Sequence, residues 1–130
     1  MRMIDSNKFS GKKILLIDRE NKTRNDRTWC FWEQGRGFFE DIVYRKWNEV
    51  LFKAGDDETI ALEMNHYQDK MIRGIDFYEH CFNEIRKHKN FDIVFGNVEN
   101  IFSNEKTGVV IDGKTVYADY VFNSVLLEKP

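Results

Sequence analysis

Cysteine and long apolar runs are scarce in this chain of 130 residues, and each scarcity excludes a class of protein. Cys30 and Cys81 are too few for a disulfide scaffold and lack the paired spacing of a zinc site, which favours a reducing, cytoplasmic setting without a bound metal. No apolar run reaches the about 18 residues of a membrane-spanning helix. Residues 1–5 also lack the apolar stretch of a signal peptide. We therefore expect a chain that is soluble, or at most peripheral to a membrane.

An excess of charge of one sign is missing as well. The 20 basic and 22 acidic residues give a formal net charge of -2, which argues against nucleic-acid binding because such binding requires a basic surface. Apolar residues make up 42% of the chain, which is enough for one buried core in a protein of this length. We therefore expect residues 1–130 to form a single domain.

The spacing of the apolar residues predicts a mixed α/β fold. Four consecutive apolar residues predict a strand over residues 13–18, of the kind that is buried on both faces of a parallel sheet. Apolar positions at helical spacing predict a helix over residues 76–88, with Asp76 and Glu79 as its N-terminal capping signal. The other predicted strands, the last four of them forming a small β-meander with a two-residue turn at Asp112-Gly113, cover residues 50–53, 59–63, 91–95, 98–102, 109–111 and 115–122.

The end of the first strand is similar to the end of the second strand in dinucleotide-binding domains. There a carboxylate, here Asp18, accepts hydrogen bonds from ribose hydroxyls, and a following arginine, here Arg19, can lie over the adenine. An acidic residue that ends a strand is also often only solvated. The Gly-rich turn of such domains stands about 20 residues before the carboxylate, which is upstream of Met1, so residues 1–12 read as the end of the first helix. The run Gly35–Gly37 does not replace that turn, because no strand-to-helix context surrounds it.

The most distinctive stretch is Asn-Asp-Arg-Thr-Trp-Cys-Phe-Trp-Glu at residues 25–33. Together with Met-Ile-Arg-Gly-Ile-Asp-Phe-Tyr at residues 71–78, it resembles the amino-terminal half of the bacterial lycopene cyclases, and the resemblance runs through essentially the whole chain. It implies a Rossmann-like FAD/NAD(P)-binding flavoprotein fold and a redox-neutral, acid-catalysed cyclisation of lycopene end groups in carotenoid biosynthesis. It also implies FAD kept reduced by NAD(P)H. The carotenoid substrate is lipophilic, so the complete enzyme would be cytoplasmic and peripheral to the inner membrane.

The aromatic residues of the first stretch are the candidate substrate-binding residues. A polyene offers no hydrogen bonds, so its pocket must be apolar and aromatic, and aromatic faces can also stabilise a developing carbocation. Trp29, Phe31 and Trp32 are the residues that the resemblance implies for this pocket. The alternative is that they are plain core, because aromatic side chains bury a large area.

Two arginines and one valine are candidate cofactor-binding residues. Arg27 and Arg73 each either meet a phosphate of FAD or pair with Asp26 and Asp76. Val98 lies where a strand of this fold commonly passes the adenine and offers it backbone groups, or it is an ordinary strand residue.

Relative to the family, we expect residues 1–130 to be one partial domain, truncated at both ends. Residues 118–124 look like the strand that returns to the nucleotide-binding domain, and the family's acidic catalytic motif lies further on, so no catalytic residue is assigned. Without the first strand, the strand at Ile14–Ile17 would have an unpaired edge through which copies could associate. The isolated fragment is expected to be inactive. The alternatives are another flavoprotein of the same fold, such as a hydroxylase or an isoprenoid reductase, and a non-catalytic binding or structural module.

Overall fold

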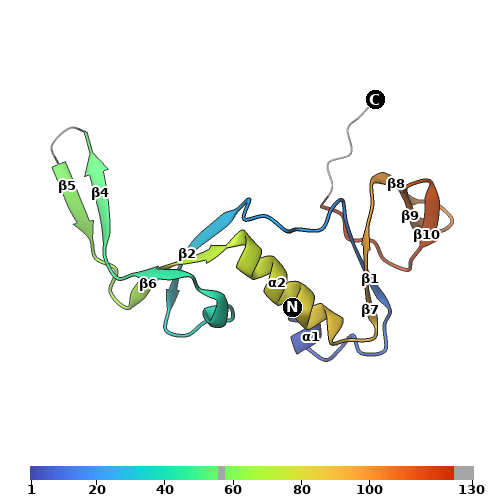
Figure 1. Cartoon of the computed structure of the whole chain (residues 1–130), viewed down its shortest axis with the longest axis horizontal. Helices are drawn as coiled ribbons and strands as arrows, with labels where there is room; N and C mark the ends of the chain where they lie inside the picture. The colour runs from blue at the N-terminus through green and yellow to red at the C-terminus, as the bar shows by residue number, and fades with distance from the viewer. Residues whose placement is uncertain (56–57, 125–130) are drawn as a thin grey trace. The chain divides into compact units, whose positions relative to one another are not determined.

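The computed structural model describes residues 1–55 and 58–124, which form a mixed α/β structure with small sheets and few helices (Figure 1). The chain divides into two compact units. Unit 1 comprises Met1 and residues 22–87, and unit 2 comprises residues 2–21 together with the residues from 88 onward. The expected α/β class is therefore observed, whereas a single domain over residues 1–130 stays a prediction.

Unit 1 contains a three-stranded antiparallel sheet, a separate hairpin and a long helix. The order within the sheet is β2-β6-β3, and β4 pairs with β5. The hairpin confirms the strands predicted at 50–53 and 59–63, although residues 56 and 57 of its expected turn lie outside the described residues. The elements of unit 1 are β2 (Thr28–Gln34), the 3-10 helix η1 (Glu40–Ile42), β3 (Arg45–Trp47), β4 (Val50–Ala54), β5 (Glu58–Leu62), β6 (Tyr67–Arg73) and α2 (Gly74–Arg86).

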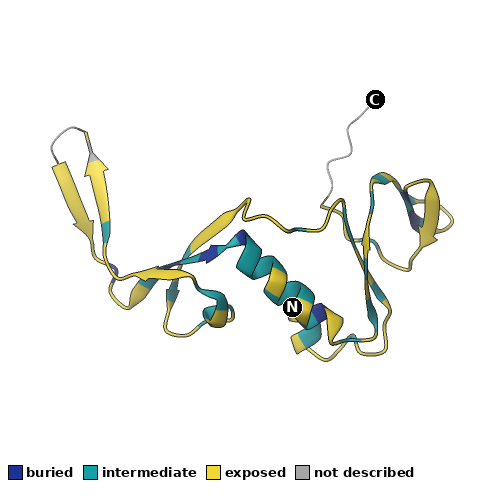
Figure 2. Ribbon diagram, in the orientation of Figure 1, coloured by how far each residue is buried: buried dark blue, intermediate teal, exposed yellow. Residues whose placement is uncertain are grey.

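The core of unit 1 lies on one face of the central strand β6. Lys70 and Ile72 lie two positions apart on this strand, and they are 0% and 2% exposed. Their neighbours on β2 are Trp29, opposite Ile72, and Phe31, opposite Lys70. Because successive side chains of a strand point to opposite faces, these four residues share one side of the sheet. Figure 2 shows buried positions, in dark blue, along β6 and in α2.

The helix α2 begins two residues earlier than predicted, at Gly74, and ends at Arg86 rather than at residue 88. The capping role expected for Asp76 is wrong: the residue before the helix is Arg73, no side chain caps the helix from that position, and Asp76 instead pairs with Arg73 in the first turn. The physical reason is that a backbone carbonyl from the segment before β2 accepts a hydrogen bond from Gly74.

Unit 2 contains a parallel pair of strands and a three-stranded antiparallel meander. The strand β1 pairs with β7 in parallel, and the meander has the order β10-β9-β8. Residues 91–95 therefore form a strand as predicted, but that strand does not belong to the meander. The elements of unit 2 are α1 (Arg2–Asp5), β1 (Ile14–Asp18), β7 (Phe91–Phe95), β8 (Val98–Ser103), β9 (Thr107–Ile111) and β10 (Lys114–Tyr117).

The two-residue turn of the meander is confirmed, but its last strand is shorter than predicted. Asp112 and Gly113 have φ values of 45° and 74°, the left-handed conformation that a tight hairpin turn requires. The strand predicted over 115–122 ends at Tyr117, and residues 118–124 are not a strand. Tyr120 and Phe122 are 82% and 86% exposed, since no strand among the described residues pairs with this segment.

The strand β1 was predicted to be buried on both faces, and this is wrong. Leu15 and Leu16 are 36% and 40% exposed. Strands buried on both faces lie in larger parallel sheets that helices cover on both sides, whereas β1 forms a two-stranded sheet with β7 among the described residues. The second edge of β1 is therefore unpaired within the described residues. The predicted helix end at residues 1–12 is limited to α1, because Asn7 turns the chain with a φ of 55°.

Candidate functional site

The two stretches that carry the family resemblance lie side by side in unit 1. Residues 25–33 include all of β2 except its last residue, and residues 71–78 include the end of β6 and the start of α2. The two strands pair antiparallel along the whole of β2, with Trp29 opposite Ile72. The stretches are far apart in the sequence, yet they form one substructure.

The segment before β2 is bonded to the first turn of α2. The backbone N–H of Gly74 donates to the carbonyl oxygen of Arg27 at 2.7 Å, and that of Ile75 donates to Asn25 Oδ1 at 3.5 Å. These contacts satisfy N–H groups that a helix start otherwise leaves without a partner. A Cβ atom at Gly74 would lie 2.8 Å from the carbonyl oxygen of Arg27, so the close approach requires glycine.

An ion pair lies within the second stretch, and a hydrogen bond between side chains joins the two stretches. Arg73 donates to both carboxylate oxygens of Asp76, at 2.6 and 2.7 Å, and lies 4.1 Å from the ring centre of Tyr44. The hydrogen bond from Arg73 lowers the pKa of Asp76 below its ordinary value. Asp26 accepts a hydrogen bond from the Tyr78 hydroxyl at 3.1 Å. Of the two alternatives for Arg73, pairing with Asp76 is thus observed, and phosphate binding by either arginine stays a prediction.

A cluster of aromatic rings surrounds Trp29. Its ring centre lies 4.9 Å from that of Phe77 and 5.9 Å from that of Tyr78, both on α2. Phe77 lies 5.3 Å from Phe39, which in turn lies 6.2 Å from His80. Trp29 remains 38% exposed, so its ring packs against α2 and is also part of the protein surface.

The three aromatic residues predicted to bind substrate do not share one surface. Trp29 and Phe31 lie on the side of the sheet that carries the buried core, and Trp32 lies on the other side. Trp32 is 55% exposed and, like Trp47 on β3, stands opposite Asp69 of β6. The structure therefore joins two of the candidates and separates the third.

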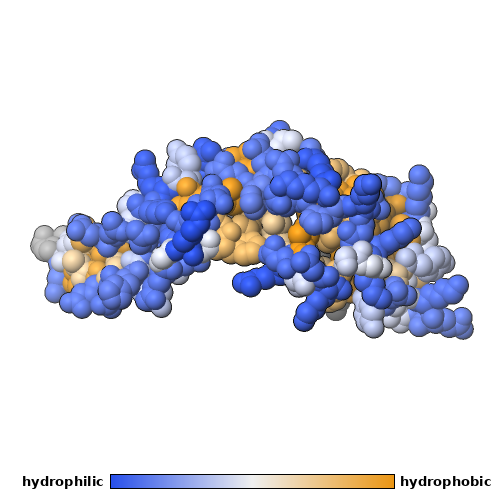
Figure 3. All heavy atoms as spheres, turned by 90° about the horizontal axis from the view of Figure 1, so that it is seen from below, coloured by the Kyte–Doolittle hydropathy of each residue, from blue (hydrophilic) through white to orange (hydrophobic). Residues whose placement is uncertain are grey.

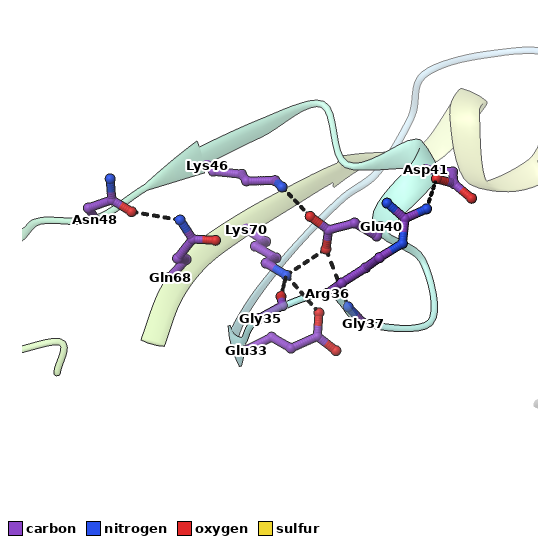
Figure 4. Close-up of polar contacts among 10 residues, drawn as sticks. All are labelled: Glu33, Gly35, Arg36, Gly37, Glu40, Asp41, Lys46, Asn48, Gln68 and Lys70. Carbon is purple, nitrogen blue, oxygen red and sulfur yellow. Dashed lines mark hydrogen bonds and ion pairs between the residues drawn. The ribbon is translucent and has the colours of Figure 1, made fainter. Parts of the chain in front are cut away.

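A buried charge cluster around Lys70 was not predicted (Figure 4). Lys70 Nζ donates to Glu33 Oε2 at 3.0 Å, to Glu40 Oε2 at 2.6 Å and to the carbonyl oxygen of Gly35 at 2.5 Å. Lys46 forms a further ion pair with Glu40. All three donors of the ammonium group have acceptors, so the burial of this charge is fully compensated.

This cluster holds the loop after β2 against the sheet and is unsuited to proton transfer at neutral pH. Hydrogen bonds from Lys46 and Lys70 lower the pKa of Glu40 from its ordinary 4.5 to about 2, and the bond to Glu40 raises the pKa of Lys70. Both groups therefore stay charged near pH 7. No local sequence signal indicates the cluster, because Glu33 and Glu40 lie 37 and 30 residues from Lys70.

An open groove of about 430 Å³ lies between η1 and α2. Its lining combines carboxylates with apolar side chains, which does not match the uniformly apolar surface that a polyene needs. The groove is lined by Asp41, Ile42, Val43, Tyr44, Asp76, Glu79, His80 and Asn83.

In unit 2, the predicted cofactor residues lie at the carboxyl ends of the parallel strands. Asp18 is the last residue of β1, and its carbonyl oxygen accepts a hydrogen bond from Gly96 at 2.9 Å, directly after β7. Its carboxylate accepts one from the N–H of Glu20 at 3.4 Å. Arg19 is exposed beside it, and Val98 follows as the first residue of β8. This end of a parallel sheet is where open α/β folds bind ligands.

Other kinds of site are not found among residues 1–55 and 58–124. Cys30 and Cys81 are free thiols. The described residues contain no group of three or more His, Cys, Asp or Glu side chains that could hold a metal ion. None of the helices described is long and apolar enough to cross a membrane.

The fold and the paired stretches thus define a mixed α/β protein whose most distinctive residues meet at the junction of β2, β6 and α2. The family model described as Lycopene cyclase protein matches residues 3–129, and the chain belongs to this family. The resemblance inferred from residues 25–33 and 71–78 is confirmed. No curated protein and no solved structure matches the chain.

Proposed function

We propose that the chain is part of an FAD-dependent lycopene cyclase that closes the end groups of lycopene without net oxidation or reduction. The single observation that carries the proposal is the match of the family to nearly the whole chain. The reaction adds one proton to a terminal double bond and removes another after ring closure. The acid that donates the proton is not assigned.

The parallel pair β1–β7 supports a Rossmann-like nucleotide-binding part of the fold, since such domains are built on parallel strands. Asp18 would accept hydrogen bonds from a ribose, Arg19 would lie over the adenine, and the backbone of Val98 would face the adenine. FAD, when bound and kept reduced by NAD(P)H, would assist the cyclisation electrostatically. Gly96, directly after β7, lies close to the meander, because a Cβ at this position would lie 2.5 Å from Asp112 Oδ2 and 2.7 Å from Ile111 Cγ2.

The substrate would contact the aromatic surface around Trp29. Trp29, Phe77 and Tyr78 form contiguous rings, and the Trp29 ring is partly exposed. Aromatic faces stabilise a cation through their quadrupole, which suits a cyclisation that passes through positive charge. Lycopene dissolves in membranes, so we place the complete protein in the cytoplasm in peripheral contact with the inner membrane.

The test is to express the complete protein that contains this chain in cells that accumulate lycopene. We expect cyclised carotenoids to replace lycopene. Folded, flavin-loaded protein together with unchanged lycopene would overturn the cyclase proposal in favour of another flavoprotein, such as a hydroxylase or an isoprenoid reductase. Folded protein without flavin and without conversion would favour a binding or structural module.

A second experiment, on variants of the complete protein, tests where the substrate surface lies. Trp29→Ala should reduce conversion by more than it reduces bound flavin, because the indole is placed on the substrate side. Trp32→Ala, on the opposite face of the sheet, is the matched comparison and should have the smaller effect. Equal loss of conversion and flavin in Trp29→Ala, with a lower Tm, would show that Trp29 is a core residue rather than a substrate contact.

A further inference from the structure

The outer edge of β4 has no partner strand in the described part of the chain. The hairpin of β4 and β5 extends from the rest of unit 1, and both strands are exposed along nearly their whole length (Figures 1 and 2). Leu51 and Phe52 are 67% and 55% exposed, and Figure 3 shows apolar atoms at the surface in this region. An isolated two-stranded hairpin is marginally stable in water, and an open edge of this kind is a template for another strand.

The charges at the two ends of β4 are opposite in sign and have no ion pair within the described residues. Glu49 precedes the strand and Lys53 lies near its end, and both are exposed. Lys53 lies two positions after Leu51 in β4, so these two side chains point to the same face, and Glu49 lies two positions before Leu51, directly in front of the strand. The edge therefore carries a minus charge, an apolar residue and a plus charge in symmetric positions.

This pattern is complementary to itself when it is turned by a two-fold axis. In an antiparallel pair of β4 strands with Leu51 on the axis, Glu49 of each copy stands opposite Lys53 of the other, and Val50 stands opposite Phe52. Neighbouring registers lose this match: one places Glu49 opposite Leu51, and the other places it opposite Gly55. Opposite charges directly across an antiparallel pair are favourable and like charges are unfavourable, so the charges select one register.

We propose that two copies of this chain associate through the β4 edges in that register. The result is a four-stranded antiparallel sheet of order β5-β4-β4-β5 with an isologous two-fold interface. Leu51, the more exposed of the two apolar residues named on β4, is covered by its copy at the axis. The interface is an edge only and smaller than that of a stable permanent dimer, so the association is reversible and concentration-dependent. It is independent of the proposed catalytic function.

Charge reversal tests the register on the 130-residue chain. We expect wild type to pass from monomer to dimer with rising concentration in sedimentation equilibrium. Glu49→Lys and Lys53→Glu each place like charges opposite each other at both ends of the interface, and each should weaken dimerisation about tenfold or more. An equimolar mixture of the two single variants should form a heterodimer, because each copy then meets opposite charges. The double variant Glu49→Lys/Lys53→Glu should also dimerise.

The controls separate the β4 edge from other surfaces. Circular dichroism and Tm of each variant verify folding, and recovery in the mixture itself excludes misfolding as the cause of the loss. Leu16→Lys changes the open edge of β1 and should leave dimerisation unchanged. The proposal is overturned if wild type stays monomeric at the highest concentration that remains in solution, or if the mixture fails to recover. Dimerisation that is lost in Leu16→Lys but retained in both charge variants would assign the interface to β1 instead.

Discussion

Lys70 occupies a position on β6 where the alternation of the strand places the core. Its neighbour on the same side, Ile72, is 2% exposed, and Lys70 itself is completely buried. The sequence could not indicate this, because a lysine between polar and apolar residues is usually exposed and its partners come from a distant loop. The sequence did single out Trp29 and Arg73, because each lies in a short stretch of unusual composition. Site residues could thus be predicted from the sequence only where their signal came from neighbouring residues.

At the residue scale, Glu40 predicts how stability depends on pH. Its folded pKa of about 2 lies below its ordinary 4.5, so the folded state binds fewer protons between these values. The stabilisation is therefore complete above pH 4.5 and is lost as the pH falls towards 2. We expect the Tm of wild type to fall in this window and that of Glu40→Gln to fall less steeply, as measured by thermal melts at a series of pH values.

The matched control for this experiment is a substitution beside the cluster that changes no charge. Asn48→Ala removes the 2.7 Å hydrogen bond from Gln68 but no ionisable group, and should keep the slope of wild type. Lys46→Met should resemble Glu40→Gln, since Lys46 is the first cause of the lowered pKa. Identical slopes in wild type and Glu40→Gln would show that the cluster does not hold the carboxylate in its charged form.

At the scale of elements, what could be predicted depended on whether the signal was contained in one segment. β1, β4, β5 and the turn of the meander followed from apolar runs and turn residues. β2 did not, because its adjacent aromatic residues show no alternation of apolar and polar positions, and β3 is only 3 residues long. The start of α2 was misplaced because its hydrogen-bond partner is Arg27, far away in the sequence.

Gly74→Ala tests the junction of the two family stretches. The new Cβ would lie 2.8 Å from the carbonyl oxygen of Arg27, a backbone atom that cannot rotate away, so the segment before β2 must move. We expect a loss of about 1–3 kcal/mol in the free energy of unfolding, typical of overpacking, despite the better helix propensity of alanine. Urea denaturation of the purified chain measures it.

Gly11→Ala is the control for Gly74→Ala. No atom lies within 4 Å of a Cβ placed at Gly11, so the change should stay within about 0.5 kcal/mol of wild type. An equal midpoint for Gly74→Ala and wild type would mean that the contact between Arg27 and α2 tolerates a methyl group and does not fix the junction.

At the scale of the whole molecule, the sequence indicated the family and the α/β class, but not how the strands are grouped. Residues 91–95 were assigned to a meander because strands close in sequence usually pair, whereas they pair with β1 across a long connection. This long-range pairing is what places Asp18 and Val98 at the same end of two parallel strands. A site of this kind depends on contacts between distant segments, which a single sequence does not show.

We expect the 130-residue chain to bind FAD weakly or not at all. Phosphate affinity in dinucleotide sites comes from free backbone N–H groups at a helix start. In α2, the N–H groups of Gly74 and Ile75 already donate to Arg27 and Asn25. At the glycine-containing turn Gly35–Gly37, two carboxylates of the Lys70 cluster would repel a phosphate.

The groups that remain cannot supply tight binding. Asp18 can still accept hydrogen bonds from a ribose, but a charge-assisted hydrogen bond contributes only about 1.5–3 kcal/mol, whereas micromolar affinity requires about 8 kcal/mol. Titration of the purified chain with FAD, followed by flavin fluorescence, should therefore show no saturable binding at micromolar concentrations. Riboflavin, which lacks the phosphates and the adenosine, is the control and should behave like FAD. Saturable micromolar binding of FAD alone that disappears in Asp18→Ala would show that a phosphate site does lie beside the carboxyl ends of β1 and β7.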